Sequence, residues 1–399
     1  MSGREIIDLS QINPSLELPS AAVDRLVQAC LQNHNHRYSS SQGISRLRRS
    51  AANWYSRRYA VELDADREVV VSMGSKEGLT HLLMSVLSPG DTVLVPTPAY
   101  PIHKSAVFLS GASLIGFPIF SQEQLAQEKL APEDFSLTSA SEDFFQRLES
   151  SYESAWPRPK ILFLSFPHNP TAATVSIDFW ERVLDFCRVN NIYLVHDFAY
   201  ADIHFDQHSA PSVLQVPGAK DIAVECYSLS KGFGLAGWRV AFVVGSPILV
   251  SALKKIKSYL DFGIFQPIQI GAAALLEQSP DYLNSFLAEV VGTYQNRAQT
   301  FVHGLKDLGW QVSMPRAGVF VWARIPEPLQ ALGSNKLCQL LLAKASVAAC
   351  PGAGFDPASD SFIRFAMVEP EHKLRQALRD LERLKDLERL KDPERLEER

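Results

Sequence analysis

Residues 68–96 read EVVVSMGSKEGLTHLLMSVLSPGDTVLVP and combine a strand, a turn, a helix and a second strand. The apolar run at 68–73 is typical of a buried strand, and it ends at the turn Gly74-Ser75-Lys76. Between residues 79 and 87, leucine and valine recur at helical spacing, and a Ser-Pro-Gly-Asp segment then stops the helix. A second apolar run follows at 92–96. This order predicts strands that are joined by crossover helices.

The same alternation of apolar, β-branched runs with amphipathic stretches continues through the middle of the chain. It predicts an α/β fold whose large domain is built on a mainly parallel, seven-stranded sheet between helices. The candidate strands are 68–73, 92–96, 113–117, 160–166, 192–196, 222–228 and 240–244.

The pattern changes after about residue 270, where long helical stretches are followed by short strand-like segments at 318–322 and 361–365. This change favours a second, smaller α+β domain that also takes in the N-terminal segment. We therefore expect a large domain at 37–275, a small domain at 1–36 and 276–385, and a charged helical tail at 386–399.

Composition limits the class of protein. The 399 residues carry 39 Lys and Arg against 44 Asp and Glu, so the net charge of -5 argues against binding to a nucleic-acid backbone. Five widely spaced cysteines lack any C-x-x-C pair, which is typical of a reducing compartment. No apolar run reaches the roughly 18 residues that a membrane span needs. We expect a cytoplasmic protein with no nucleic-acid or membrane partner.

Lys231 is the first candidate for chemistry. The sequence Ser228-Leu-Ser230-Lys231 follows an apolar strand, and Arg239 lies eight residues downstream. A lysine amine in this position can form a Schiff base with an aldehyde cofactor, while the two hydroxyls and the arginine suit a phosphate. The alternative is an ordinary solvated lysine.

The G-x-G-x-x-G match at 232–237 runs into a strand-like segment rather than a helix, so we interpret it as a chance match and not a dinucleotide site.

Two more polar residues follow candidate strands. Asp197 comes directly after the strand at 192–196, and a carboxylate there suits a protonated pyridine nitrogen. Asn169 follows the strand at 160–166 and could donate to a phenolate oxygen. A helix N-cap remains the alternative for Asp197, and a simple Asn-Pro turn the alternative for Asn169.

Two loops complete the set. The turn at Gly74, Ser75 and Lys76 opens a helix, so its amides offer an anion site, although an ordinary N-cap would look similar. Tyr100 lies in the rigid loop Pro96-Thr-Pro-Ala-Tyr100-Pro and suits stacking on a heteroaromatic ring. A packed loop tyrosine is the alternative.

In this order along the chain, the motifs resemble those of the class I/II aminotransferases of fold type I, which bind pyridoxal 5′-phosphate. Within the family the chain is most similar to the bacterial alanine and LL-diaminopimelate aminotransferase branch. The motifs that carry this likeness are GSKEG at 74–78, FPHNPT at 166–171, VHDFAYAD at 195–202, AGWR at 236–239 and IRFAMVE at 363–369.

The resemblance implies a role for each site residue. Lys231 would hold the cofactor as a Schiff base and act as the base at the substrate Cα, and Asp197 would pair with the pyridine nitrogen. The other implied cofactor contacts are Asn169 and Tyr200 to the ring hydroxyl, Tyr100 on the ring face, and the phosphate ligands Ser75, Lys76, Ser228, Ser230 and Arg239 beside Gly74, with Tyr38 from a second subunit. Lys231, Asp197 and Tyr200 form the implied catalytic set.

For the substrate, the resemblance implies that Arg364 clamps the α-carboxylate, because a guanidinium binds a carboxylate through two hydrogen bonds. Asn169 would also face the substrate. Relatives commonly read Ser-Ile-Gly-Asn-Pro where this chain reads Ser10-Gln-Ile-Asn-Pro14, so Ile12 replaces a glycine and is expected to affect substrate size.

The expected reaction is ping-pong transamination between an L-amino acid and a 2-oxo acid, with alanine, aspartate or LL-diaminopimelate as donor and 2-oxoglutarate or pyruvate as acceptor. A homodimer with a shared active site is expected, because Tyr38 needs a neighbouring subunit. Two alternatives remain open. One is a C-S β-lyase of the same fold and cofactor, and the other is a non-catalytic regulator that keeps the cofactor domain.

Overall fold

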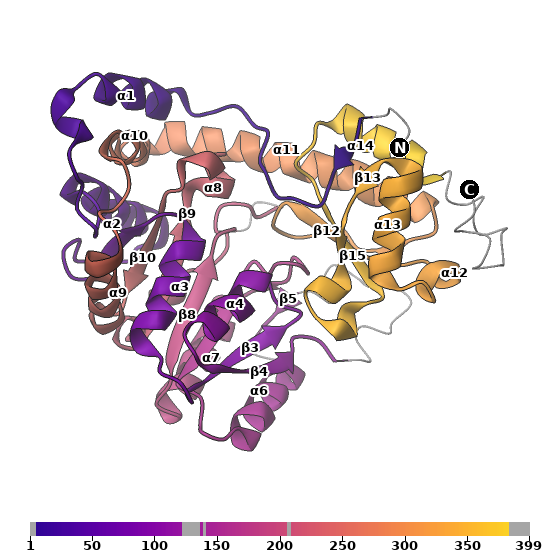
Figure 1. Ribbon diagram of the computed structural model, residues 1–399, viewed down its shortest axis with the longest axis horizontal. Helices are drawn as coiled ribbons and strands as arrows, with labels where there is room; N and C mark the ends of the chain where they lie inside the picture. Colours follow the sequence, from indigo (N-terminus) through magenta and orange to yellow (C-terminus); the bar gives the residue numbers. More distant parts are fainter. Residues whose placement is uncertain (1–4, 122–135, 139–140, 206–208, 383–399) are drawn as a thin grey trace.

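The computed structural model describes residues 5–121, 136–138, 141–205 and 209–382. Figure 1 shows a larger lobe built around a twisted sheet and a smaller lobe, in orange and yellow, built from the C-terminal part of the chain. The charged tail expected at 386–399 lies outside the described residues.

The large lobe contains the predicted seven-stranded sheet, in the order β2-β10-β9-β8-β6-β3-β4. Only β10 runs antiparallel to its neighbours β2 and β9, and the other pairs are parallel. The strands are β2 (Val69–Ser72), β3 (Thr92–Thr97), β4 (Ser113–Pro118), β6 (Ile161–Ser165), β8 (Tyr193–Phe198), β9 (Ala223–Ser228) and β10 (Ala241–Gly245). All seven candidate strands are therefore confirmed.

Helices cover both faces of this sheet, which is why its strands are apolar throughout. Along β6, Ile161 and Phe163 pack into one hydrophobic cluster, whereas Leu162 and Leu164 pack into another. Successive side chains of a strand point to opposite faces, so the two clusters lie on opposite sides of the sheet. The first cluster takes in α3 (Ser75–Val86), α4 (Pro101–Leu109) and α9 (Pro247–Leu260), and the second takes in α2 (Ser45–Tyr59), α6 (Glu142–Ser154), α7 (Ile177–Val189) and α10 (Gln266–Leu276).

The segment at 121–159 is rich in Ser, Glu and Gln, a composition that predicts a surface helix, and helix α6 lies within it. The helix is present, but Phe144 and Phe145 on its inner face are almost fully buried against α7. Residues 122–135 and 139–140 of this segment lie outside the described residues.

The small lobe has a four-stranded antiparallel sheet in the order β11-β12-β15-β14. Its elements are β11 (Gln311–Val312), β12 (Phe320–Arg324), β13 (Val347–Ala348), β14 (Cys350–Pro351), β15 (Phe362–Ala366), α12 (Glu327–Gln330), α13 (Gly333–Ala345) and α14 (Glu371–Glu382). Helix α11 (Pro280–Asp307) joins the lobes, as Figure 1 shows, because Leu283 and Leu287 pack in the large-lobe core and Tyr294 and Phe301 in the small-lobe core.

The N-terminal segment contacts both lobes. Strand β1 (Ile7–Asp8) pairs with β13 of the small lobe, whereas α1 (Ser20–Cys30) packs against α10 of the large lobe. The chain between β1 and α1 passes over the junction of the lobes. The domain limits expected at residues 36 and 275 remain predictions. Within the described part of the chain, no helix has the length and apolar character to cross a membrane.

Candidate active site

A cavity of about 650 Å³ lies where strands β6, β8 and β9 end at the junction of the two lobes. This placement follows from the fold, because ligands of open α/β sheets bind at the carboxyl ends of the strands. Its walls come from the N-terminal segment, the large lobe and the small lobe. The lining residues are Ser10, Gln11, Ile12, Asn13, Ser75, Lys76, Tyr100, Ile102, Ser165, Asn169, Asp197, Ala199, Tyr200, Ser228, Ser230, Lys231, Ala236, Arg239 and Arg364.

Lys231 lies in the short helix α8 (Leu229–Gly232), directly after β9. Its Nζ donates a 2.7 Å hydrogen bond to the main-chain oxygen of Ile12. Burial lowers the pKa of Lys231 from 10.5 to about 8, and the nearby guanidinium of Arg364 acts in the same direction. A lowered pKa increases the share of neutral amine, the form that attacks a carbonyl carbon.

Asp197 is the next-to-last residue of β8 and is almost fully buried. Its Oδ2 lies 2.9 Å from Nε2 of His103, which is itself buried behind the cavity wall on α4. The other carboxylate oxygen accepts a bond from the amide of Ala199, so Asp197 bridges a local turn and does not cap a helix. These two contacts fix the orientation of the buried Asp197 carboxylate at the cavity wall.

Arg364 on β15 brings the small lobe into the site. Its Nη1 donates to Asn169 Oδ1 at 3.0 Å, and its Nη2 donates to the main-chain oxygen of Ser10 at 2.6 Å. Its Nε is buried and makes no hydrogen bond within the described part of the chain. A buried guanidinium with a spare donor fits an anionic ligand such as a carboxylate.

Tyr200 is held in the same network, because Asn169 Nδ2 donates to its hydroxyl at 3.4 Å. Burial raises the pKa of Tyr200 well above its ordinary value, so the hydroxyl stays protonated and available as a donor. Asn169 thus contacts the small lobe through its oxygen and the large lobe through its nitrogen.

The N-terminus of α3 lies at the cavity, where Ser75 and Lys76 line the wall, and the free amides of a helix N-terminus suit an anion. Arg239 lies against this turn so closely that a Cβ at Gly74 would meet its Nη2 at 2.0 Å. Gly74 also has a φ of +77°, which side-chain-bearing residues rarely adopt. Both constraints explain the glycine between β2 and α3.

Most of the predicted site residues meet in this one cavity. Those that line it are Ile12, Ser75, Lys76, Tyr100, Asn169, Asp197, Tyr200, Ser228, Ser230, Lys231, Arg239 and Arg364. Gly74 lies behind the wall, against Arg239. Tyr38 does not line this chain's own cavity: it is 84% exposed and packs on Phe262 with 4.3 Å between ring centres.

Two partners in the site, His103 and the main-chain oxygen of Ser10, are predicted by none of the sequence motifs. His103 follows Tyr100 by three residues at the start of a helix, and this spacing places the two on one face, with 5.8 Å between their ring centres. This three-residue spacing from Tyr100 is the sequence feature that could have indicated His103. Ser10 acts through its main-chain oxygen, which no side-chain motif can reveal.

Comparisons with known proteins agree with this geometry. The family model described as aminotransferase class I and II matches residues 4–381. The glutamate-pyruvate aminotransferase AlaC of Escherichia coli (strain K12) is 42% identical over 95% of this chain and 87% of its own length. An LL-diaminopimelate aminotransferase of Nitratidesulfovibrio vulgaris is 35% identical over 94% of this chain and 90% of its own. The solved structure of substrate-bound BacF from Bacillus subtilis superposes with a TM-score of 0.85 at 32% identity, over 96% of this chain and 91% of that one.

Proposed function

The chain belongs to the class I and II aminotransferases, and from this premise we propose that its cavity exchanges an amino group between glutamate and pyruvate. It is a pyridoxal 5′-phosphate-dependent enzyme that transfers an amino group between an amino acid and a 2-oxo acid. The observation that carries the site assignment is the meeting of Lys231, Asp197 and Arg364 in one cavity. The choice of glutamate and pyruvate rests on the relative that is 42% identical.

The residues of the cavity fit this cofactor. Arg239, Ser228, Ser230 and the N-terminus of α3 gather hydrogen-bond donors and positive charge at one end, which suits a phosphate. Buried Asp197 suits a protonated ring nitrogen. When bound, pyridoxal 5′-phosphate supplies an aldehyde carbon for covalent attachment and a protonated ring that accepts electrons from the substrate Cα.

In this proposal, the neutral amine of Lys231 would hold the cofactor and would also be the base that takes the proton from the substrate Cα. Asp197 would keep the ring nitrogen protonated, and His103 Nε2, 2.9 Å from Oδ2 of Asp197, holds this carboxylate in place. The hydroxyl of Tyr200 and the amide of Asn169 would orient the ring hydroxyl. Arg364 would bind the α-carboxylate with its guanidinium, whose Nε makes no hydrogen bond to the described part of the chain.

The proposal includes a homodimer. Its support is a patch of exposed apolar residues beside Tyr38, in which Phe262 is 61% exposed. We call this set the α9–α10 patch, and it consists of Tyr38, Tyr259, Leu260, Phe262 and Phe265. A second subunit that covers the patch would bring Tyr38 to the phosphate of its neighbour.

We also propose that the enzyme is cytoplasmic, because its five cysteines form no disulfide, as is usual in a reducing compartment.

The test is an assay of the cofactor-loaded enzyme with alanine and 2-oxoglutarate. We expect equal amounts of glutamate and pyruvate, and we expect the Lys231→Ala variant to form neither. LL-diaminopimelate in place of alanine tests the second relative's reaction. Cystathionine that yields pyruvate and ammonia without an acceptor would identify a β-lyase instead. If the protein binds the cofactor but turns over no substrate, the proposed activity is wrong and the protein is a non-catalytic regulator.

A further inference from the structure

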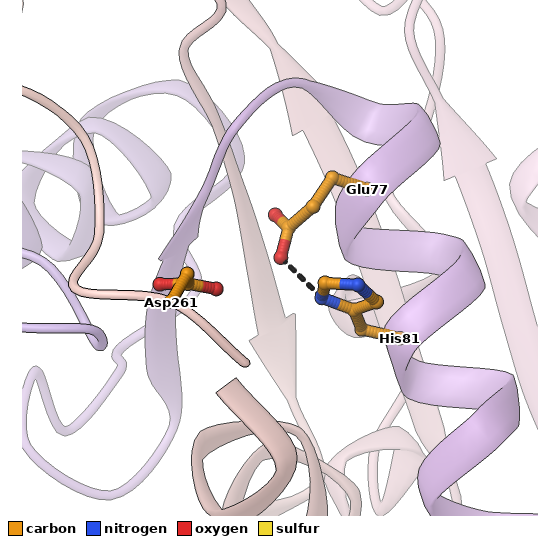
Figure 2. Close-up of side chains that lie close together, drawn as sticks. All are labelled: Glu77, His81 and Asp261. Atoms are coloured by element: carbon orange, nitrogen blue, oxygen red, sulfur yellow. Dashed lines mark ion pairs between the residues drawn. The ribbon is translucent and has the colours of Figure 1, made fainter. Parts of the chain in front are cut away.

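A cluster of charged side chains lies outside the cavity, between helices α3 and α9. Figure 2 shows Glu77 and His81 on α3 facing Asp261 on the loop after α9. Glu77 Oε1 lies 2.5 Å from His81 Nδ1. The same oxygen accepts a 2.8 Å hydrogen bond from Lys257 Nζ, which also donates to Asp261 Oδ2 at 2.9 Å.

Glu77, His81 and Asp261 present ligand atoms within 4.8 Å of one another, which is compatible with a metal ion. The cluster already has its own cation, however, because the ammonium of Lys257 bridges the two carboxylates. The side chain of Lys257 is 1% exposed, against 17% and 18% for the two carboxylates. A buried ammonium is retained only where such partners hold it. We therefore interpret the cluster as an ion-pair network.

One end of the network holds the anion-binding turn. The second oxygen of Glu77, Oε2, accepts a 2.8 Å bond from the main-chain amide of Met73. Met73 precedes Gly74, whose position against Arg239 shapes the phosphate end of the cavity. Glu77 therefore connects Lys257 to the start of the turn that presents Ser75 and Lys76.

The other end holds a loop of the α9–α10 patch. The second oxygen of Asp261, Oδ1, accepts a 2.6 Å bond from the amide of Gly263. A Cβ at Gly263 would meet the main-chain oxygen of Ser40 at 2.3 Å, so this loop packs directly on the segment that carries Tyr38. Phe262, between Asp261 and Gly263, is the ring on which Tyr38 packs.

We propose that Lys257 is a positioning residue that couples cofactor binding to subunit pairing, because it joins the phosphate-binding turn to the loop that supports Tyr38. This inference rests on the proposed cofactor site and homodimer. Coupling of this kind is reciprocal: if the cofactor tightens the dimer by some factor, then dimer formation tightens cofactor binding by the same factor.

The experiment measures the dimer dissociation constant by sedimentation velocity, with and without pyridoxal 5′-phosphate. We expect the cofactor to tighten the wild-type dimer at least tenfold, and to tighten the Lys257→Met dimer less than threefold. Lys257→Arg should retain most of the coupling, since it keeps a cation between Glu77 and Asp261. Lys255→Met is the matched control, because Lys255 lies on the same helix but is exposed, and it should behave as wild type.

If Lys257→Met does not fold, Asp261→Asn replaces it, because an amide oxygen can still accept the bond from Gly263 while the charge that faces Lys257 is lost. It should reduce the coupling at least threefold. Full coupling in the folded Lys257→Met or Asp261→Asn protein would overturn the inference alone. A wild-type chain that does not bind the cofactor, or that stays monomeric with it, would overturn the proposed function instead.

Discussion

At the scale of single residues, the pKa of Lys231 is set by burial and by the charged side chains around the cavity. Burial and the positive charges of Arg364, Arg239 and Lys76 all disfavour its ammonium form, and Asp197 only partly offsets them. The positive charge in the cavity therefore has two effects. It suits an anionic cofactor, and it lowers the pKa of Lys231 so that more of its amine is neutral. Among the described residues that line the cavity, Asp197 is the one carboxylate, so its negative charge acts on the amine of Lys231 and would act on the cofactor.

This arrangement predicts how the cofactor-free protein reacts with acetic anhydride, which acetylates a lysine only through its neutral amine. Because the pKa of Lys231 is lowered to about 8, its acetylation rate should rise with pH and level off above a midpoint near 8, instead of near 10.5. Mass spectrometry of the peptide that contains Lys231 measures the rate. Arg364→Met removes a neighbouring positive charge and should move the midpoint upward. An unchanged midpoint near 10.5 in the wild type would contradict the prediction.

The same shift has a consequence for stability. Between pH 8 and 10.5 the unfolded chain holds a proton on Lys231 that the folded chain has lost, so the unfolded state binds more protons. The free energy of unfolding of the cofactor-free protein should therefore rise with pH across this window. The rise should be smaller in Lys231→Met, which has no such proton. Chemical denaturation at pH 8 and pH 10 measures the difference between the two proteins.

At this scale the sequence predicted the side chains of the cavity well and their partners poorly. Lys231, Asp197, Asn169 and Arg364 belong to motifs that span strand ends, and strand ends converge in space. His103 lies on a helix whose orientation the sequence does not reveal. The bond from Lys231 to the main-chain oxygen of Ile12 depends on a segment 219 residues away, which local patterns cannot locate.

At the scale of elements, the strand-to-helix turn at Gly74 combines two demands. Its φ of +77° disfavours any other residue, and its Cα lies against the guanidinium of Arg239. The seven strands around it were predictable, because both faces of the sheet are covered and each strand is a continuous apolar run. The sequence also indicated the turn, but not the reason for its glycine, since Arg239 comes from a distant part of the chain.

Gly74→Ala should therefore weaken cofactor binding at least tenfold, because the new methyl group would displace Arg239 from the proposed phosphate site. It should also cost about 1–3 kcal/mol of stability through the strained backbone. Gly90→Ala is the matched control: Gly90 has a φ of +93° but nothing within 4 Å of an added Cβ. Titration of both apoproteins with pyridoxal 5′-phosphate separates the effects. Equal loss of affinity in the two variants would show that backbone strain, and not the clash, matters.

At the scale of the whole molecule, the cavity depends on three parts of the chain that are remote in sequence. The N-terminal segment supplies Ile12 and Ser10, the large lobe supplies Lys231, and the small lobe supplies Arg364. The sequence predicted the two lobes from the change of pattern near residue 270. It did not predict that α1 packs on α10, since an amphipathic helix does not specify its partner.

The α9–α10 patch raises the question of what covers it in solution. Exposed apolar patches of contiguous side chains are uncommon on monomers and mark interaction sites. Phe262 is 61% exposed although it lies between two residues, Asp261 and Gly263, that are joined by a hydrogen bond. The loop is thus held in a shape that presents the ring outward, which favours a specific partner over a chance exposure.

Phe262→Asp should therefore convert the proposed dimer to a monomer, because it places a charge within the exposed patch that a second subunit would cover and removes the ring that supports Tyr38. The monomer should bind pyridoxal 5′-phosphate at least tenfold more weakly, since the proposed Tyr38 contact comes from the neighbouring subunit. Phe108→Asp is the matched control, because Phe108 on α4 is 62% exposed and lies outside the patch. Light scattering gives the mass, and a cofactor titration gives the affinity. A Phe262→Asp protein that remains dimeric would place the subunit contact elsewhere, whereas a monomer with wild-type affinity would show that each cavity is complete within one chain.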